Sequence, residues 1–302
     1  MASGPKNLVE FVGKSLKGPV QPDAKWLAEE IIKGFNRNAL GVLYYGSCLR
    51  TGQLEGLVLD FYVIVRDYRK AYGKPAPAFL NKMIPPNVYY REAKKGKKTL
   101  RAKFAVISLD DFMKRTGPKR TNISVWARFS QPARLIHCSN EGARAQITKG
   151  IAEAHETMLA ASMPLMVGKL TPENIWINAL ELTYAAELRA EDATKARNLF
   201  YLNQPYFGEV TPFVLHEVYA EPLESARKAR RKWLLRRING KFVSAARLVK
   251  AAFTFAGGID YLAWKIERHS GVKMTLKPWQ RRFPLLAAPY LYFSLRRKGA
   301  FR

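Results

Sequence analysis

Short apolar segments separated by turn residues fill the first part of the chain. They are rich in β-branched and aromatic residues and predict five strands, at residues 41–45, 57–65, 87–91, 100–108 and 133–138. From about Asn140 the apolar positions recur at helical spacing, which predicts helices over 141–166, 171–189 and 193–202. The pattern therefore predicts an α+β fold, in which a mixed sheet with helices is followed by an α-helical domain and a basic helical C-terminal region.

Shorter elements are predicted between these segments. Helices are expected over 22–35, 109–115 and 122–129, and a hairpin turn over 94–98. Residues 1–20 are expected to be a loose basic lead-in. Residues 66–85 are charged and then proline-rich, and are expected to be a loop.

The net charge of the chain limits the classes of molecule that it is expected to bind. Its 302 residues carry 51 Lys and Arg against 24 Asp and Glu, a formal net charge of +27. Such a chain seeks nucleic acid, an anionic lipid surface or nucleotide phosphates. Cys48 and Cys138 form no disulfide framework or zinc site, which favours a reducing compartment, and Cys48 is expected to fill a small space rather than to be a reactive thiol. Neither a secretory signal nor a membrane-spanning stretch of ~20 apolar residues is expected.

Arginines and bulky side chains interleave in the last third of the chain. The aromatic members are Trp233, Trp264, Trp279, Phe283, Tyr290 and Tyr292. Such a segment suits the interface of an anionic membrane, but it also suits nucleic acid or a solvated helix face. Because no RNA-binding signature is present, an anionic membrane surface is the favoured partner and nucleic acid the less favoured one.

One strand–turn–strand unit carries the candidate chemistry. Gly46 and Ser47 end the first strand, and the next strand contains a single charge, Asp60. An unpaired carboxylate in an apolar strand is costly to bury, so Asp60 requires either a hidden basic partner or a metal ion. A Gly-Ser turn ahead of such an aspartate is typical of the nucleotidyltransferase fold. A two-metal site usually has a second carboxylate two residues away, but Val58 and Tyr62 occupy those positions.

Two further groups of charges lie later in the chain. Strand alternation places Arg101 and Lys103 on one face of the sheet, where they would either grip a triphosphate or be solvated. Tyr184, Glu187 and Glu191 share one face of the helix predicted over 171–189. That helix end is either a charged surface or a second wall of the site.

Five motifs follow one another in a characteristic order: Tyr45-Gly46-Ser47, Leu59-Asp60-Phe61, Asn87-Val88-Tyr89-Tyr90, Lys103-Phe104-Ala105-Val106-Ile107-Ser108, and Tyr184 to Arg189 with Glu191-Asp192 and Lys195. This order resembles that of the mitochondrial-type phosphatidate cytidylyltransferases, also known as the mitochondrial translocator assembly and maintenance family. The resemblance covers roughly residues 40–210.

The resemblance implies a role for each site residue. Tyr45, Gly46, Ser47 and Lys103 would bind the nucleotide; Asp60, Lys103 and Glu187 would be catalytic; Asp60 and Glu187 would hold Mg²⁺; Arg189 and Lys195 would bind the substrate phosphate. It also implies a nucleotidyltransferase-like domain over residues 1–139, a helical domain over 140–220 and a membrane-surface region over 221–302.

The implied reaction joins CTP to phosphatidic acid and gives CDP-diacylglycerol and pyrophosphate. The protein would use Mg²⁺ and would be peripheral, on the cytoplasmic or matrix side of an inner membrane. Two alternatives remain open. One is a nucleotidyltransferase that acts on RNA or protein, and the other is a non-enzymatic module that binds anionic lipid on a decayed transferase fold.

Overall fold

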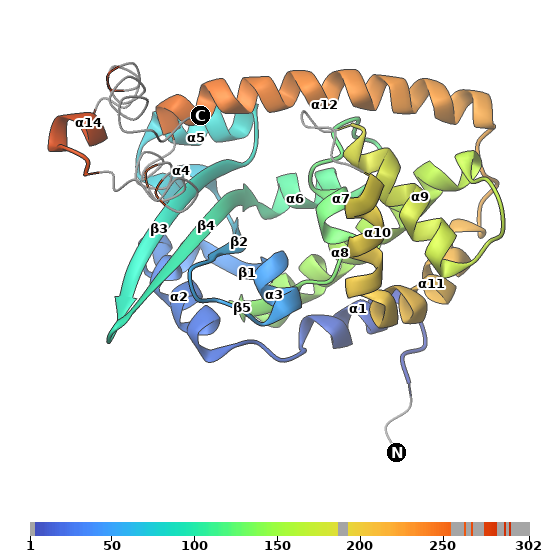
Figure 1. Ribbon diagram of the computed structural model, residues 1–302, viewed down its shortest axis with the longest axis horizontal. Helices are drawn as coiled ribbons and strands as arrows, with labels where there is room; N and C mark the ends of the chain where they lie inside the picture. Colours follow the sequence, from blue (N-terminus) through green and yellow to red (C-terminus); the bar gives the residue numbers. More distant parts are fainter. Residues whose placement is uncertain are drawn as a thin grey trace.

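A five-stranded mixed sheet forms the centre of the molecule (Figure 1). The computed structural model describes residues 4–186 and 193–254 and, beyond these, residues 263, 267, 275–282, 287 and 290. The strands are β1 (Ala39–Tyr45), β2 (Val58–Val65), β3 (Asn87–Lys95), β4 (Lys98–Ser108) and β5 (Arg134–Cys138), in the spatial order β3-β4-β2-β1-β5. Strands β2 and β4 are parallel, and the remaining pairs are antiparallel. The predicted α+β fold and its five strands are confirmed.

Strand alternation divides the core into two clusters, one on each face of the sheet. Phe61 and Val63 of β2 lie in the cluster covered by α2 (Pro22–Ile32), α4 (Tyr68–Tyr72) and α5 (Pro75–Met83). Tyr62 and Ile64 point to the opposite face, which is covered by α1 (Leu8–Leu16), α6 (Leu109–Thr116), α7 (Trp126–Phe129) and α8 (Glu141–Ser162). Asp60 shares this second face with Tyr62.

The helical region continues from α8 through a 3₁₀ turn at Met163–Leu165. It comprises α9 (Pro172–Tyr184), α10 (Ala193–Leu202), α11 (Gln204–Val218), the long α12 (Ala226–Thr254) and the short α14 (Pro278–Arg282). The predicted start of α9 is confirmed, because the Thr171 side chain accepts a hydrogen bond from the Asn174 amide at 3.3 Å. One hydrophobic cluster joins these helices to the sheet across the predicted boundary after residue 139, and the division into domains stays a prediction.

Helix α12 runs along one edge of the molecule, from the helical region to β3 and α5 (Figure 1). Its residue Gly240 approaches the end of α9 so closely that an added Cβ would lie 2.1 Å from the Ala186 carbonyl oxygen. Glycine at this position therefore permits the close approach of α12 to the end of α9.

Two sequence predictions were wrong. Residues 1–20 are not a loose lead-in, because α1 buries Leu8, Phe11, Val12 and Leu16 against α8 and α11. The apolar positions in this basic segment have helical spacing, and that spacing outweighs its charge.

Residues 66–85 are not a loop, because they form α4 and α5. Asp67 caps the first of these helices, and Pro75 begins the second, where a missing amide hydrogen costs nothing. Proline and charge in this segment therefore mark helix starts.

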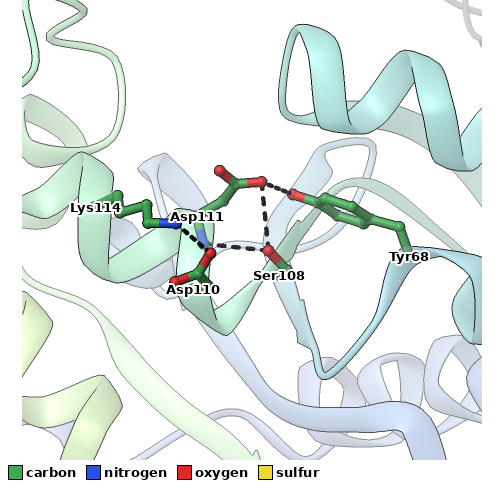
Figure 2. Close-up of polar contacts among 5 residues, drawn as sticks. All are labelled: Tyr68, Ser108, Asp110, Asp111 and Lys114. Atoms are coloured by element: carbon green, nitrogen blue, oxygen red, sulfur yellow. Dashed lines mark hydrogen bonds and ion pairs between the residues drawn. The ribbon is translucent and has the colours of Figure 1, made fainter.

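Helix α6 links β4 to α4 through its first turn. Ser108 caps the helix by accepting a hydrogen bond from the Asp111 amide at 3.2 Å, and the Tyr68 hydroxyl donates to Asp111 Oδ2 at 2.8 Å (Figure 2). Lys114 pairs with Asp110 one turn earlier, at 2.5 Å. The Ser108 hydroxyl in turn donates to Asp111 Oδ2 at 3.4 Å, so neutral donors from two other elements hold the Asp111 carboxylate.

Within the described ranges, no helix is both long enough and apolar enough to cross a membrane.

Candidate functional site

The turn after β1 brings Gly46 against Asp60. Gly46 has φ 90° and ψ −166°, a conformation that is almost restricted to glycine. A Cβ at this position would lie 2.8 Å from Asp60 Oδ2. Glycine is therefore required both by the backbone and by the close approach of the carboxylate.

Asp60 has a basic partner, one of the two alternatives that the sequence left open for this carboxylate. Lys103 is its register partner on β4, and the Lys103 ammonium lies 3.2 Å from Asp60 Oδ1. The Asp60 side chain is 23% exposed and the Lys103 side chain 40% exposed, so solvent and ligands reach the pair. Arg101 pairs instead with Glu92 of β3 at 2.9 Å. Lys103 thus lies beside Asp60 on one face of the sheet, and its predicted role in binding a triphosphate stays a prediction.

A cavity of about 270 Å³ opens beside this pair. Four of the residues predicted for the site line it together: Tyr45, Gly46, Ser47 and Asp60. Tyr184 at the end of α9 forms part of its opposite wall. The strand–turn–strand unit and the helical region therefore meet at one cleft.

Sequence reasoning missed two arginines that also line this cleft, Arg50 and Arg128. The Arg128 guanidinium lies 4.9 Å from the centre of the Tyr45 ring. Burial lowers the pKa of Arg50, and its Nε has no hydrogen-bond partner in the described part of the chain. Arg50 follows Ser47 by three residues in α3 (Ser47–Thr51), a spacing that places both side chains on one face of a helix and that the sequence could have shown. Nothing in the sequence connects Arg128 with the turn.

The other predicted site residues are not part of this geometry. Glu187 and Arg189 lie outside the described residues, as do Glu191 and Asp192. Lys195 is exposed on α10 and is not among the residues that line the cleft.

Cys48 points away from the cleft into the core. Its thiol is buried and donates to the Val58 carbonyl at 3.5 Å, and burial raises its pKa. A buried, protonated thiol is unreactive, so the prediction that Cys48 fills a small space is confirmed.

The donor set suits a hard cation that shares its ligands with a substrate. Among the described residues, no three His, Cys, Asp or Glu side chains gather as a preformed metal site. Mg²⁺ usually needs only one or two carboxylates and takes its other ligands from water and phosphate oxygens. The Asp60 carboxylate and the Ser47 hydroxyl, which line the same cleft, fit that pattern.

The cleft thus combines the Asp60 carboxylate with two arginines, Arg50 and Arg128. Lys103 is not among the lining residues and is connected to the cleft through its ion pair with Asp60. Such a site can bind a polyphosphate and neutralise its charge, and none of the described residues that line it is a cysteine or histidine that could act as a nucleophile or base. Comparison with protein-family models and with curated proteins gives no match.

Proposed function

We propose that the protein is a CTP:phosphatidate cytidylyltransferase of the nucleotidyltransferase fold. The observation that carries the proposal is the meeting of the Gly46-Ser47 turn with Asp60, the ion-pair partner of Lys103, at one cleft. The sequence predicted these residues for the site, and Arg50 and Arg128 add the charge that a triphosphate needs.

The reaction forms one bond and breaks one. An oxygen of the lipid phosphate attacks the α-phosphorus of CTP, a new P–O–P linkage forms, and the bond to the β-phosphate oxygen breaks so that pyrophosphate leaves. The attacking phosphate is already anionic, so the site needs no strong general base. Its residues instead position the two phosphates and stabilise the charge that develops, with Lys103 and Arg50 on the triphosphate.

Mg²⁺ would be held by Asp60 and by the nucleotide itself. It would supply charge neutralisation and alignment of the phosphates. Glu187, which the resemblance implies as a second ligand, belongs to this proposal by sequence alone.

The outer surface of α12 supports binding to the surface of a membrane. Leu234, Ile238 and Phe242 form one exposed stripe at helical spacing, and their exposed fractions are 57%, 60% and 74%. Exposed arginines and lysines flank this stripe: Arg230, Arg231, Arg237 and Lys241. A basic helix with an exposed apolar stripe is typical of proteins that lie on anionic bilayers. The enzyme would be peripheral, on the cytoplasmic or matrix side of an inner membrane.

Binding and turnover test the proposal against its alternatives. Purified protein with CTP, Mg²⁺ and phosphatidic acid in vesicles is expected to release pyrophosphate, and to prefer anionic vesicles to RNA at physiological salt. Preference for RNA, with transfer of nucleotide to it, would favour the RNA-directed transferase. Failure to bind any nucleoside triphosphate with Mg²⁺ would favour the non-enzymatic module.

A further inference from the structure

The buried side of α12 carries cations where a helix ordinarily carries apolar residues. Positions three and four apart face inward along its length: Ala229, Trp233, Arg236, Gly240, Val243, Arg247 and Lys250. Arg236 is accommodated by two rings, since its guanidinium lies 5.0 Å from the centre of Trp233 and 5.9 Å from that of Trp126. Among the described residues, no aromatic ring packs over the Arg247 guanidinium in this way, so its burial needs another explanation.

Arg247 and Lys250 contact neutral oxygens of the segment before β3. Arg247 Nη2 donates to the Pro85 carbonyl at 2.7 Å. Lys250 Nζ donates to the carbonyl of Ile84 and, at 2.8 Å, to that of Pro86. These contacts hold α12 against the sheet, but neutral carbonyl oxygens do not cancel the charge of the Arg247 guanidinium.

A third cation, Arg115 of α6, adds to this charge. Burial lowers the pKa of Arg115 and of Arg247, and repulsion between the two lowers that of Arg247 further. The Nε atoms of both arginines are buried and have no hydrogen-bond partner among the described residues. Both side chains keep part of their surface exposed, so a ligand can reach them.

An acidic residue beside Arg115 is already engaged by other partners. Asp111, which partly offsets the charge of Arg115, accepts hydrogen bonds from Tyr68 and Ser108 (Figure 2). In the described ranges, neither Arg115 nor Arg247 forms an ion pair with a carboxylate. Donors that are buried and unpartnered around a surplus of positive charge are the features of an anion site.

We propose that Arg115, Arg247 and Lys250 bind a phosphate monoester, and that this group is the acceptor phosphate of the reaction. The assignment of this group as the acceptor phosphate rests on the proposed function. Arginine suits this ligand because its planar donors match phosphate oxygens in pairs.

The position of the cluster relative to the cleft fits an acceptor site. Tyr62 lies close enough to Arg115 and Arg247 that its hydroxyl, once ionised, would raise the pKa of both, and it follows Asp60 by two residues on the same face of β2, a step of about 7 Å. Arg128, which lines the cleft, is near enough to Arg247 for its positive charge to lower the pKa of Arg247 as well. The two anion sites would therefore be neighbours on one sheet face.

Calorimetric titration of the full chain with inorganic phosphate, without CTP or Mg²⁺, tests the site. Arg247→Gln and, from a different helix, Arg115→Gln are each expected to weaken phosphate binding at least roughly tenfold. Arg227→Gln removes the same charge from an exposed position of α12 and is expected to leave the affinity unchanged. Phosphate binding that survives in both cluster variants but is lost in Arg50→Gln would place the anion in the cleft and overturn the inference.

Two further measurements identify the ligand of this site. Dihexanoyl phosphatidate is expected to compete with inorganic phosphate, whereas dihexanoyl phosphatidylcholine, which has no monoester, is not. Arg247→Gln is expected to raise the KM for phosphatidate and to leave that for CTP unchanged.

The outcomes separate this inference from the proposed function. Wild-type protein that binds phosphate through Arg247 but never turns over CTP would retain the anion site and refute the transferase. Turnover by Arg247→Gln with an unchanged KM for phosphatidate would refute the acceptor site and retain the transferase.

Discussion

The Asp60 carboxylate lies 3.2 Å from the ammonium of Lys103, its register partner on the adjacent parallel strand. The pair balances its own charge when no ligand is bound, which explains why an acidic residue is tolerated in an otherwise apolar strand. Asp60 lines the cleft, so under the proposed function a nucleotide and its metal ion would compete for both partners of the pair.

Asp60→Asn is expected to lower the rate of pyrophosphate release at least roughly 100-fold, because the metal ion loses its carboxylate ligand. Circular dichroism should show that the variant stays folded. Glu92→Gln is a matched control, because Glu92 pairs with Arg101 on the same sheet at 2.9 Å and does not line the cleft. Equal losses in the two variants would contradict a specific role for Asp60.

Gly46→Ala is expected to lower the free energy of unfolding by about 1–3 kcal/mol and to abolish turnover. Its Cβ would meet Asp60 Oδ2 at 2.8 Å, in a conformation with φ 90°. Gly56→Ala is the control, because Gly56 also has a positive φ but has no atom within 4 Å of an added Cβ. That variant should cost about 1 kcal/mol in urea unfolding and keep its activity. Retained activity in Gly46→Ala would contradict the proposed role of the turn.

Lys103→Gln is expected to raise the KM for CTP at least roughly tenfold, since a charged donor to the triphosphate is lost. Arg101→Gln removes a cation two residues earlier on the same strand face, where Glu92 is its partner. Steady-state kinetics at saturating phosphatidate should show the increase for Lys103→Gln alone. A larger effect of Arg101→Gln would show that the nucleotide lies further along the sheet.

Stability is expected to fall in mild acid because of His155. This buried side chain lies 2.8 Å from both the Ile151 carbonyl and the Tyr206 hydroxyl, and burial lowers its pKa from 6.5 to about 4. Between pH 6.5 and pH 4, the His155 imidazole is therefore protonated in the unfolded chain but neutral in the folded chain. The free energy of unfolding should therefore decrease by roughly 3 kcal/mol as the pH falls from 6.5 to 4.

Urea unfolding as a function of pH measures this loss. His155→Gln should lack this component of the pH dependence, and His216→Gln, at an exposed position of α11, should retain it. The same slope in both variants would show that another group is responsible.

Local patterns in the sequence were sufficient to predict much of the sheet. Alternation identified the strands and placed Lys103 on its correct face, and the cost of burying Asp60 predicted that it has a partner. These properties depend on residues close together in the chain or on a single strand, where spacing determines direction.

What the sequence did not predict depends on contacts between distant segments. Arg128 reaches the cleft only because α7 packs beside β1, and Arg247 meets Pro85 across 162 residues. The basic pattern of α12 predicted a helix at a membrane surface, but it gave no reason to expect cations on the inward side. Such positions are set by tertiary packing, and the local periodicity of the sequence carries no information about it.

The most direct test of the central claim is a single assay with purified protein, CTP, Mg²⁺ and vesicles that contain phosphatidic acid, in which pyrophosphate and lipid-linked CMP are both measured. The proposed function predicts that the two products appear in equal amounts with the wild-type protein and that neither appears with Asp60→Asn. Absence of both products with every lipid phosphate tried, from wild-type protein that is folded and bound to the vesicles, would contradict it.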